Sequence, residues 1–167
     1  MKDDAGHEGA LQRLLKSFRR YYNVRTEGAA APFAAEAEFH SHGQHYFLVK
    51  AAHLADMDSN EYVFFASLPE LSLEELESLA GKAWQTGLSR VHPYSGHRSS
   101  DITLVVVADR VAEPAFAAAK KLSFYKSYRF SFYGWSHFRA LVLEASSGRS
   151  AANRFASDLQ KLLGNMQ

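Results

Sequence analysis

Residues 91–110 read VHPYSGHRSSDITLVVVADR, and the second half of this stretch decides the fold. Residues 102–108 are almost uninterruptedly apolar and lack the alternation of a half-exposed strand, which is typical of a strand buried on both faces. We therefore expect this strand at the centre of a sheet. The first half of the stretch is a polar loop, and loops carried by a rigid scaffold are where functional residues collect.

Four segments outside this strand have the period of an amphipathic helix. In residues 10–22 the apolar side chains recur three and four positions apart and form one face. The second helix begins at Ser72, because Ser72 and Glu75 form the reciprocal capping box of a helix N-terminus. Gly87 marks its end or a loosening of it. The third and fourth helices are predicted at residues 116–122 and 155–163.

The remaining ordered segments alternate apolar and polar residues with the period of a half-buried strand. In residues 128–133 the rings of Tyr128, Phe130 and Phe132 share one face, which we expect to be buried. Short turns join the first three strands into an antiparallel meander. The strands other than the central one are predicted at residues 33–40, 46–54, 62–66, 128–133 and 137–144.

The resulting order is αβββαβαββα, which predicts an α+β fold, an α/β sandwich. We expect a mixed, largely antiparallel sheet of about six strands with helices packed on it. A chain of 167 residues is long enough for one domain with a hydrophobic core. Residues 1–9 lack any apolar pattern, so we expect a disordered start and a single α/β domain over residues 10–167.

The composition excludes several classes of protein. The chain has no cysteine, which rules out disulfides, thiolate metal sites and a cysteine nucleophile. It has neither the apolar core of a signal peptide nor a run of roughly 20 apolar residues that would span a bilayer. A soluble cytoplasmic protein is therefore expected, without membrane contact and without a cofactor. The oligomeric state is not readable from these features.

The net charge of +1 hides an uneven distribution. Residues 1–83 hold 8 basic and 13 acidic residues, whereas residues 84–167 hold 11 and 5. A basic half can attract an anionic partner, including nucleic acid. Residues 120–139, KKLSFYKSYRFSFYGWSHFR, interleave cations with rings as single-strand-binding surfaces do. We weigh nucleic acid below other partners, because rings that stack on bases must be exposed and these alternate as buried rings do.

Two catalytic patterns are incomplete. The serine-hydrolase motif G-x-S-x-G begins at Gly134 and Ser136, but Phe138 stands where its last glycine belongs. The order αβββαβ resembles the core of the restriction-endonuclease-like fold, whose enzymes need an acid-x-lysine pair for a divalent metal. Glu36 and Glu38 lie on the first strand, yet position 48, two before Lys50, is a leucine. A diverged, metal-dependent nuclease is therefore only an alternative, and whether the protein is an enzyme stays open.

A metal site in the first hairpin is the weaker candidate. His40, His42 and His45 lie on either side of a tight turn, but no carboxylate or cysteine completes a familiar ligand set. We therefore predict no metal.

The best candidate site is the polar loop 92–100. Its donors suit an anionic small molecule or partner, and no glycine-rich phosphate motif is present. If the late strand pairs beside the central one, two further polar residues join the site. The predicted site residues are His92, His97, Arg98 and Ser99, with His137 and Arg139 as neighbours.

A series of segments is familiar as a set: LLKSFRRYYNV in the first helix, HYFLVKAAHL, NEYVFF, then His92, His97 and Ser99 before ITLVVVAD, and later FYGW. In this series the chain resembles a family of short uncharacterised bacterial and archaeal proteins, a domain of unknown function. The resemblance covers most of the chain. It implies the fold order above and a shared loop containing His92, His97 and Ser99, and it brings no activity with it.

Overall fold

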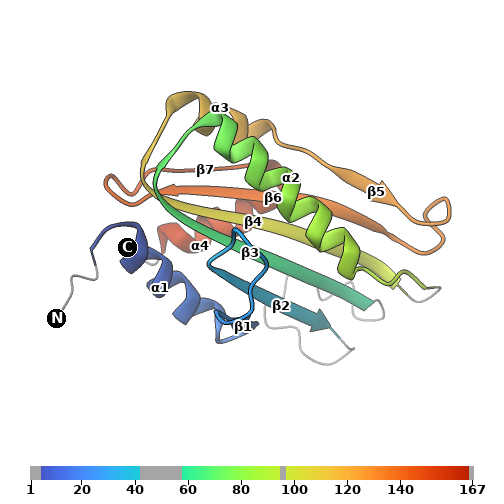
Figure 1. Cartoon of the computed structure of the whole chain (residues 1–167). Coiled ribbons are helices and arrows are strands. Elements are labelled where there is room, and N and C mark those ends of the chain that lie inside the picture. Colours follow the sequence, from blue (N-terminus) through green and yellow to red (C-terminus); the bar gives the residue numbers. More distant parts are fainter. Residues whose placement is uncertain (1–4, 42–57, 95–96, 166–167) are drawn as a thin grey trace.

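A single sheet runs through the computed structural model, which describes residues 5–41, 58–94 and 97–165 (Figure 1). Its strands, taken over the described residues, are β1 (Asn23–Arg25), β2 (Ala35–Ser41), β3 (Asp58–Leu71), β4 (His97–Val111), β5 (Tyr125–Ser127), β6 (Trp135–Glu144) and β7 (Ser150–Ala152). The helices are α1 (Gly6–Phe18), α2 (Leu73–Arg90), α3 (Glu113–Lys121), the 3-10 turn η2 (Arg154–Ala156) and α4 (Ser157–Gly164).

The sheet has the order β1-β2-β3-β4-β6-β5, and β7 pairs with β6. β4 runs parallel to both β3 and β6, while the pairs β1–β2, β2–β3, β5–β6 and β6–β7 are antiparallel. The predicted mixed, largely antiparallel sheet with packed helices is therefore confirmed. β4 is its central strand, as the apolar run predicted, and residues 102–108 are all fully buried.

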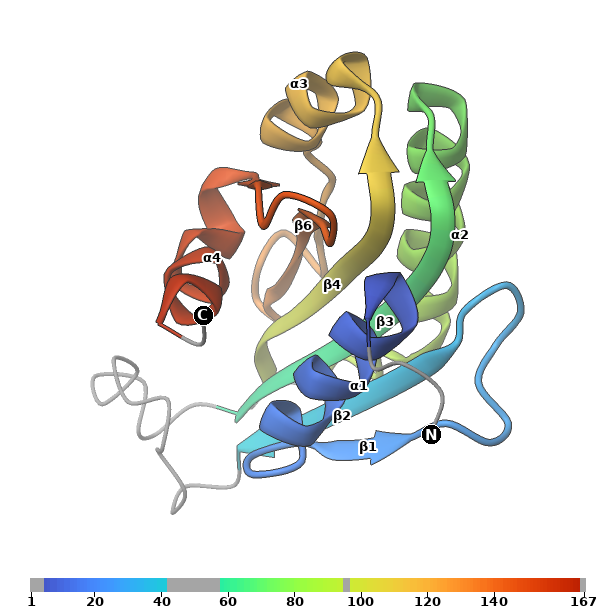
Figure 2. The same cartoon turned by 90° about the vertical axis from the view of Figure 1, so that its left-hand side faces the viewer.

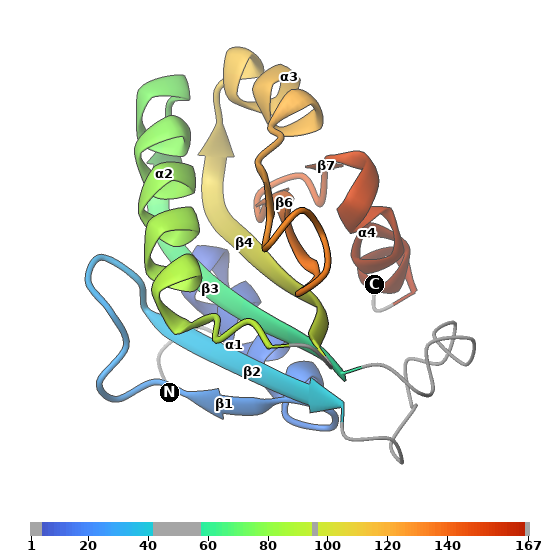
Figure 3. The same ribbon diagram turned by 90° about the vertical axis from the view of Figure 1, so that its right-hand side faces the viewer.

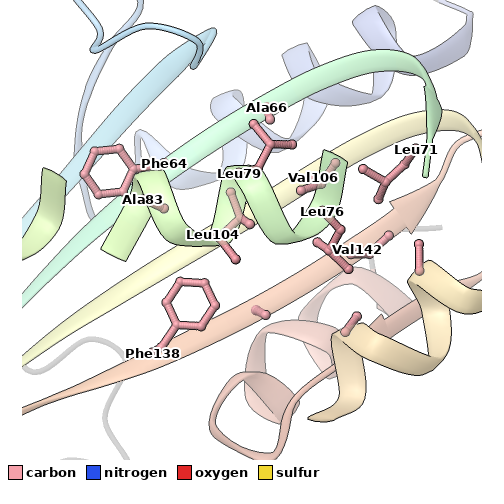
Figure 4. Close-up of a cluster of buried hydrophobic side chains, with 14 of the residues drawn as sticks. Phe64, Ala66, Leu71, Leu76, Leu79, Ala83, Leu104, Val106, Phe138 and Val142 are labelled. Carbon is pink, nitrogen blue, oxygen red and sulfur yellow. The ribbon is translucent and has the colours of Figure 1, made fainter. Parts of the chain in front are cut away.

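Helices cover both faces of the sheet. α1 and α4 lie on one face (Figure 2), and α2 and α3 lie on the other (Figure 3). Alternate residues of β4 serve the two cores: Leu104 and Val106 pack under α2 (Figure 4), whereas Val105 and Val107 pack with α1. Helices therefore cover both faces of β4. For this reason the middle of the strand does not alternate between apolar and polar residues.

Helix α2 shows one confirmed and one wrong prediction. The backbone N–H of Glu75 donates to Ser72 Oγ at 3.1 Å, so the serine half of the predicted capping box is present. Gly87 was expected to end or loosen the helix, but α2 continues to Arg90. The physical reason is packing: Gly87 is buried, and a side chain there would run into Ile102 of β4.

The predicted strand at residues 128–133 is wrong, because the chain turns back on itself there. β5 ends at Ser127, and Arg129, Phe130 and Ser131 have positive φ values of 50°, 52° and 71°. Left-handed backbone breaks the alternation on which the burial prediction rested. Phe130 is 95% exposed and Phe132 78% exposed, so neither ring reaches the core.

Other boundaries differ from the sequence pattern. α1 begins at Gly6, earlier than expected, and the backbone N–H of His7 donates to Asp109 Oδ1 at 2.7 Å, a contact across 102 positions that anchors this helix end. The short strands β1 and β7 were not predicted. The predicted strand 46–54 lies outside the described residues. Among the helices that the structure describes, none is both long and apolar enough to cross a membrane.

Candidate ligand-binding cleft

A cleft of about 350 Å³ opens between α1 and α4. Its floor is Val105 of β4 and Leu141 of β6, which are Cα partners across the two parallel strands. α1 rests on β3 and β4, and α4 rests on η2 and β7, so the border between β4 and β6 lies between the helices (Figure 2). The walls and rim are Leu14, Ser17, Phe18, Arg20, Tyr21, Tyr22, Leu159, Leu162, Leu163 and Asn165.

Tyr22 joins the apolar cleft to a buried polar cluster. Its hydroxyl donates to Glu61 Oε2 at 2.8 Å, and the residue is 8% exposed. Burial and the negative charge of Glu61 raise the pKa of Tyr22 far above its ordinary value. The hydroxyl therefore stays protonated and acts as a donor throughout the physiological range.

Arg139 is the centre of that polar cluster. Its Nη1 donates to Glu61 Oε1 at 2.8 Å, its Nη2 to Asp158 Oδ1 at 2.6 Å and its Nε to the carbonyl of Phe155 at 2.8 Å. Thr103 Oγ1 also donates to Glu61 Oε1, at 3.0 Å. Burial lowers the pKa of Arg139, but the surrounding carboxylates outweigh it and hold the pKa above its ordinary value. All three guanidinium nitrogens are thus engaged within the protein.

Asp101 adds a further carboxyl group to the cluster. It lies half-buried on β4, opposite Glu61 of β3 in the strand register. Burial raises the pKa of Asp101 to about 7, Arg139 acts in the opposite direction, and Glu61 and Asp158 add to the increase. The cluster therefore carries more carboxyl groups than cations, and it disfavours an anionic group placed directly beside it.

His97, one of the predicted site residues, is 1% exposed and fully engaged. Nδ1 lies 2.6 Å from the carbonyl oxygen of Tyr133, and Nε2 lies 2.7 Å from Ser100 Oγ. A carbonyl only accepts, so Nδ1 carries the proton, and in the neutral ring Nε2 accepts from the serine hydroxyl. His97 thus ties the turn after β5 to β4.

The other predicted residues fall in different environments. His92 is exposed in the loop after α2. Arg98 belongs to β4, but its side chain is not among those that the structure describes. Ser99 Oγ donates to Ser59 Oγ at 3.3 Å. His137 lies on the same face of β6 as Arg139, and its ring stacks on Phe155 with 4.5 Å between centroids. Burial, and then the charge of Arg154, lower the pKa of His137.

β6 does pair beside β4, as the sequence analysis required for His137 and Arg139 to join the site. The structure brings those two residues together on the α1–α4 face. His97 bonds instead to Ser100, which precedes Ile102 by two positions and faces α2. The ligand site at residues 92–100 stays a prediction.

The candidate metal ligand His40 and the candidate nuclease residue Glu36 both form hydrogen bonds within the protein. His40 Nδ1 lies 2.9 Å from Asn60 Oδ1, and its Nε2 lies 3.2 Å from Glu38 Oε2. Glu36 is buried and accepts from Arg25, Arg90 and the backbone N–H of Ala30. Within residues 5–41, 58–94 and 97–165 no three histidine or carboxylate side chains form a metal-binding group. His42, His45, Leu48 and Lys50 lie outside the described residues.

The site residues predicted from the sequence do not include the members of the polar cluster around Arg139, namely Tyr22, Glu61, Asp101, Thr103 and Asp158. A signal was present on β4, where Asp101 and Thr103 are two positions apart and therefore share a face of an otherwise apolar strand. Polar residues at the starts of neighbouring buried strands indicate a shared polar cluster, but only if the strand order is known.

Comparison with known proteins identifies a family for this chain and no activity. A family model described as a domain of unknown function matches residues 7–165, which is nearly the whole chain. No curated protein and no solved structure gives a significant match.

Proposed function

The chain belongs to the DUF8052 family, a domain of unknown function, in agreement with the resemblance noted in the sequence, and we propose that it binds a small amphipathic anion in the α1–α4 cleft. The observation that carries this proposal is an apolar cleft, floored by the central strands of the sheet, with an arginine at its rim. An anionic ligand was also expected from the sequence, although at the loop 92–100 and not in this cleft.

The size and lining of the cleft suit the apolar part of such a ligand. Small-molecule sites typically have volumes of roughly 300–1,000 Å³ and mostly apolar walls, and this cleft is about 350 Å³. Each buried methylene contributes about 0.8 kcal/mol. An alkyl chain of about eight carbons would therefore contribute about 6 kcal/mol before the cost of association.

Arg20 supplies the charge for the head group. It lies at the rim of the cleft and is exposed. Across the described ranges no side-chain hydrogen bond or ion pair engages its guanidinium, in contrast to Arg139. Tyr22, two positions after Arg20, separates the cleft from the carboxyl groups of Glu61, Asp101 and Asp158, because its hydroxyl donates to Glu61. We expect a bound anion to place its head group at Arg20 on the rim and its chain over the floor residues Val105 and Leu141.

Titration calorimetry with decanoate, and with decanol as the neutral counterpart, tests the proposal. Leu162 is 46% exposed at the mouth of the cleft, so Leu162→Glu adds a charge there without touching the core. We expect Leu162→Glu to abolish binding of both compounds and Lys161→Glu, on the same helix but outside the cleft, to leave it intact. Unchanged decanoate binding in Leu162→Glu would refute the location.

The head-group assignment has its own pair of variants. Arg20→Gln should weaken decanoate binding about ten-fold, since a charge-assisted hydrogen bond contributes roughly 1.5 kcal/mol, and should leave decanol binding unchanged. Arg19→Gln, next to it and outside the cleft, is the control. If His92→Ala lowers decanoate binding and Leu162→Glu does not, the ligand binds at the loop 92–100.

A further inference from the structure

The turn at residues 128–134, called here the aromatic turn, has a fixed shape. The backbone N–H of Tyr128 donates to the carbonyl of Gly134 at 2.9 Å, and that of Tyr133 donates to the carbonyl of Tyr128 at 3.0 Å. His97 Nδ1 is hydrogen-bonded to the carbonyl oxygen of Tyr133, and the Tyr128 hydroxyl lies 2.8 Å from Ser136 Oγ. A turn with these anchors presents its outer side chains in a defined arrangement.

The outer side chains are aromatic and face solvent. Phe130 is 95% exposed and Phe132 is 78% exposed, and Tyr125 on the adjacent edge strand β5 is 56% exposed. The left-handed conformation of Arg129, Phe130 and Ser131 is costly for residues other than glycine. Residues held in such conformations cluster at functional sites, and neighbouring exposed apolar rings mark interaction sites.

The surroundings of these rings are cationic. The sequence has no aspartate or glutamate between Glu113 and Glu144. Lys126 lies 5.7 Å from the centre of the Tyr128 ring, and the Arg129 guanidinium lies 5.4 Å from that of Tyr133. The exposed cations of this segment are Lys120, Lys121, Lys126 and Arg129. A partner of complementary chemistry carries several negative charges and flat apolar groups.

We propose that the aromatic turn and β5 bind single-stranded nucleic acid. The rings of Tyr125, Phe130 and Phe132 stack on unpaired bases, and the lysines and arginine contact phosphates. In a duplex the faces of the bases are already covered, so the surface selects single strands. Arg129 directly precedes Phe130 in the turn, and a tip that enters a lipid bilayer would have its cations set back from its apolar rings.

The exposure of Phe130 and Phe132 favours nucleic-acid binding by residues 120–139, which the sequence pattern had disfavoured. The sequence pattern weighed against nucleic acid because it predicted Phe130 and Phe132 on a buried strand face. The structure places them outside, at the edge of the sheet, where β5 is the last strand.

Fluorescence anisotropy with a labelled oligothymidylate of about a dozen nucleotides, measured over a series of salt concentrations, tests the proposal. The logarithm of the binding constant should fall with the logarithm of salt concentration with a slope of about −0.7 for each phosphate contacted, or up to about −3 for four cations. Lys126→Gln should reduce the slope by about 0.7, whereas Lys161→Gln on α4 should leave it unchanged.

The double variant Phe130→Ala/Phe132→Ala isolates stacking. Both rings lie outside the core, so the variant should keep its melting temperature and salt slope while its affinity falls at least ten-fold, the size expected for lost base stacking. Unchanged affinity in this variant overturns the proposal. So does equal binding of polyphosphate of matched length, which has charge but no bases, or binding confined to phosphatidylserine vesicles.

Discussion

Two glycines of α2 respond in opposite ways to the same substitution. A Cβ at Gly87 would lie 2.7 Å from both Cγ1 and Cγ2 of Ile102 and 2.8 Å from its Cδ1. At Gly81 a Cβ would meet nothing within 4 Å. Replacing glycine by alanine in a helix interior contributes about 1 kcal/mol of helix propensity at either position. At Gly87 the packing against β4 decides whether alanine raises or lowers the free energy of unfolding.

At Gly81 the propensity gain stands alone, so Gly81→Ala should raise the free energy of unfolding by up to about 1 kcal/mol. At Gly87 overpacking opposes it and costs typically 1–3 kcal/mol. Ile102 is fully buried and has three atoms within reach of the new methyl group, so the cost lies near the upper end. We expect Gly87→Ala to lower the free energy of unfolding by about 2 kcal/mol, which separates the two variants by about 3 kcal/mol.

Urea unfolding followed by far-UV circular dichroism measures both values. Ile102→Ala removes all three contacting atoms, so in that background Gly87→Ala should become neutral or stabilising, and a double-mutant cycle reports the coupling. The reasoning fails if Gly87→Ala in the wild-type background is as stabilising as Gly81→Ala, because α2 would then not lie on β4 as described.

Three further variants test the caps and the polar cluster. Ser72→Ala should lower the free energy of unfolding by about 1 kcal/mol, because it removes the acceptor for the Glu75 N–H; a loss below a few tenths would contradict the cap. Arg139→Met should cost about 3–5 kcal/mol in urea unfolding, since Glu61 is left buried without its cation; a neutral result would mean that the pair is not buried. The pKa of Asp101 is raised from 3.8 to about 7, so its protonated form is favoured in the folded protein. The stability that this group contributes is present below about pH 4 and is lost as the pH rises through about 7. Asp101→Asn should therefore melt near the wild-type temperature at about pH 3.5 and above it at pH 8, and a difference in melting temperature that does not change with pH would argue against the raised pKa.

Much of the fold was readable from local pattern. The period of 3.6 marks helices, and an apolar run marks a strand covered on both sides, because both depend only on neighbouring residues. The central place of β4 and the cap at Ser72 were predicted on this basis and are confirmed. The apolar residues of α1 and α4 that wall the cleft, such as Leu14 and Leu159, were also recognised as buried stripes.

The cleft itself could not be predicted. Its existence depends on how far apart α1 and α4 lie on the sheet, and that distance follows from the order of β3, β4, β6 and β7 and from contacts such as Arg139 with Asp158. The same is true of the polar cluster, whose members come from three strands, from the turn after α1 and from the first turn of α4. No pattern along the chain specifies which faces of separate strands meet.

The aromatic turn shows this division most clearly. The sequence by itself determined that residues 120–139 are cationic and rich in rings, because composition needs no structure. Whether the rings face the core or solvent was decided by three residues in left-handed conformation and by the bond from His97 to Tyr133, 36 positions away. Alternation predicts burial only while the backbone stays extended, and here a long-range contact helps to hold it in a turn.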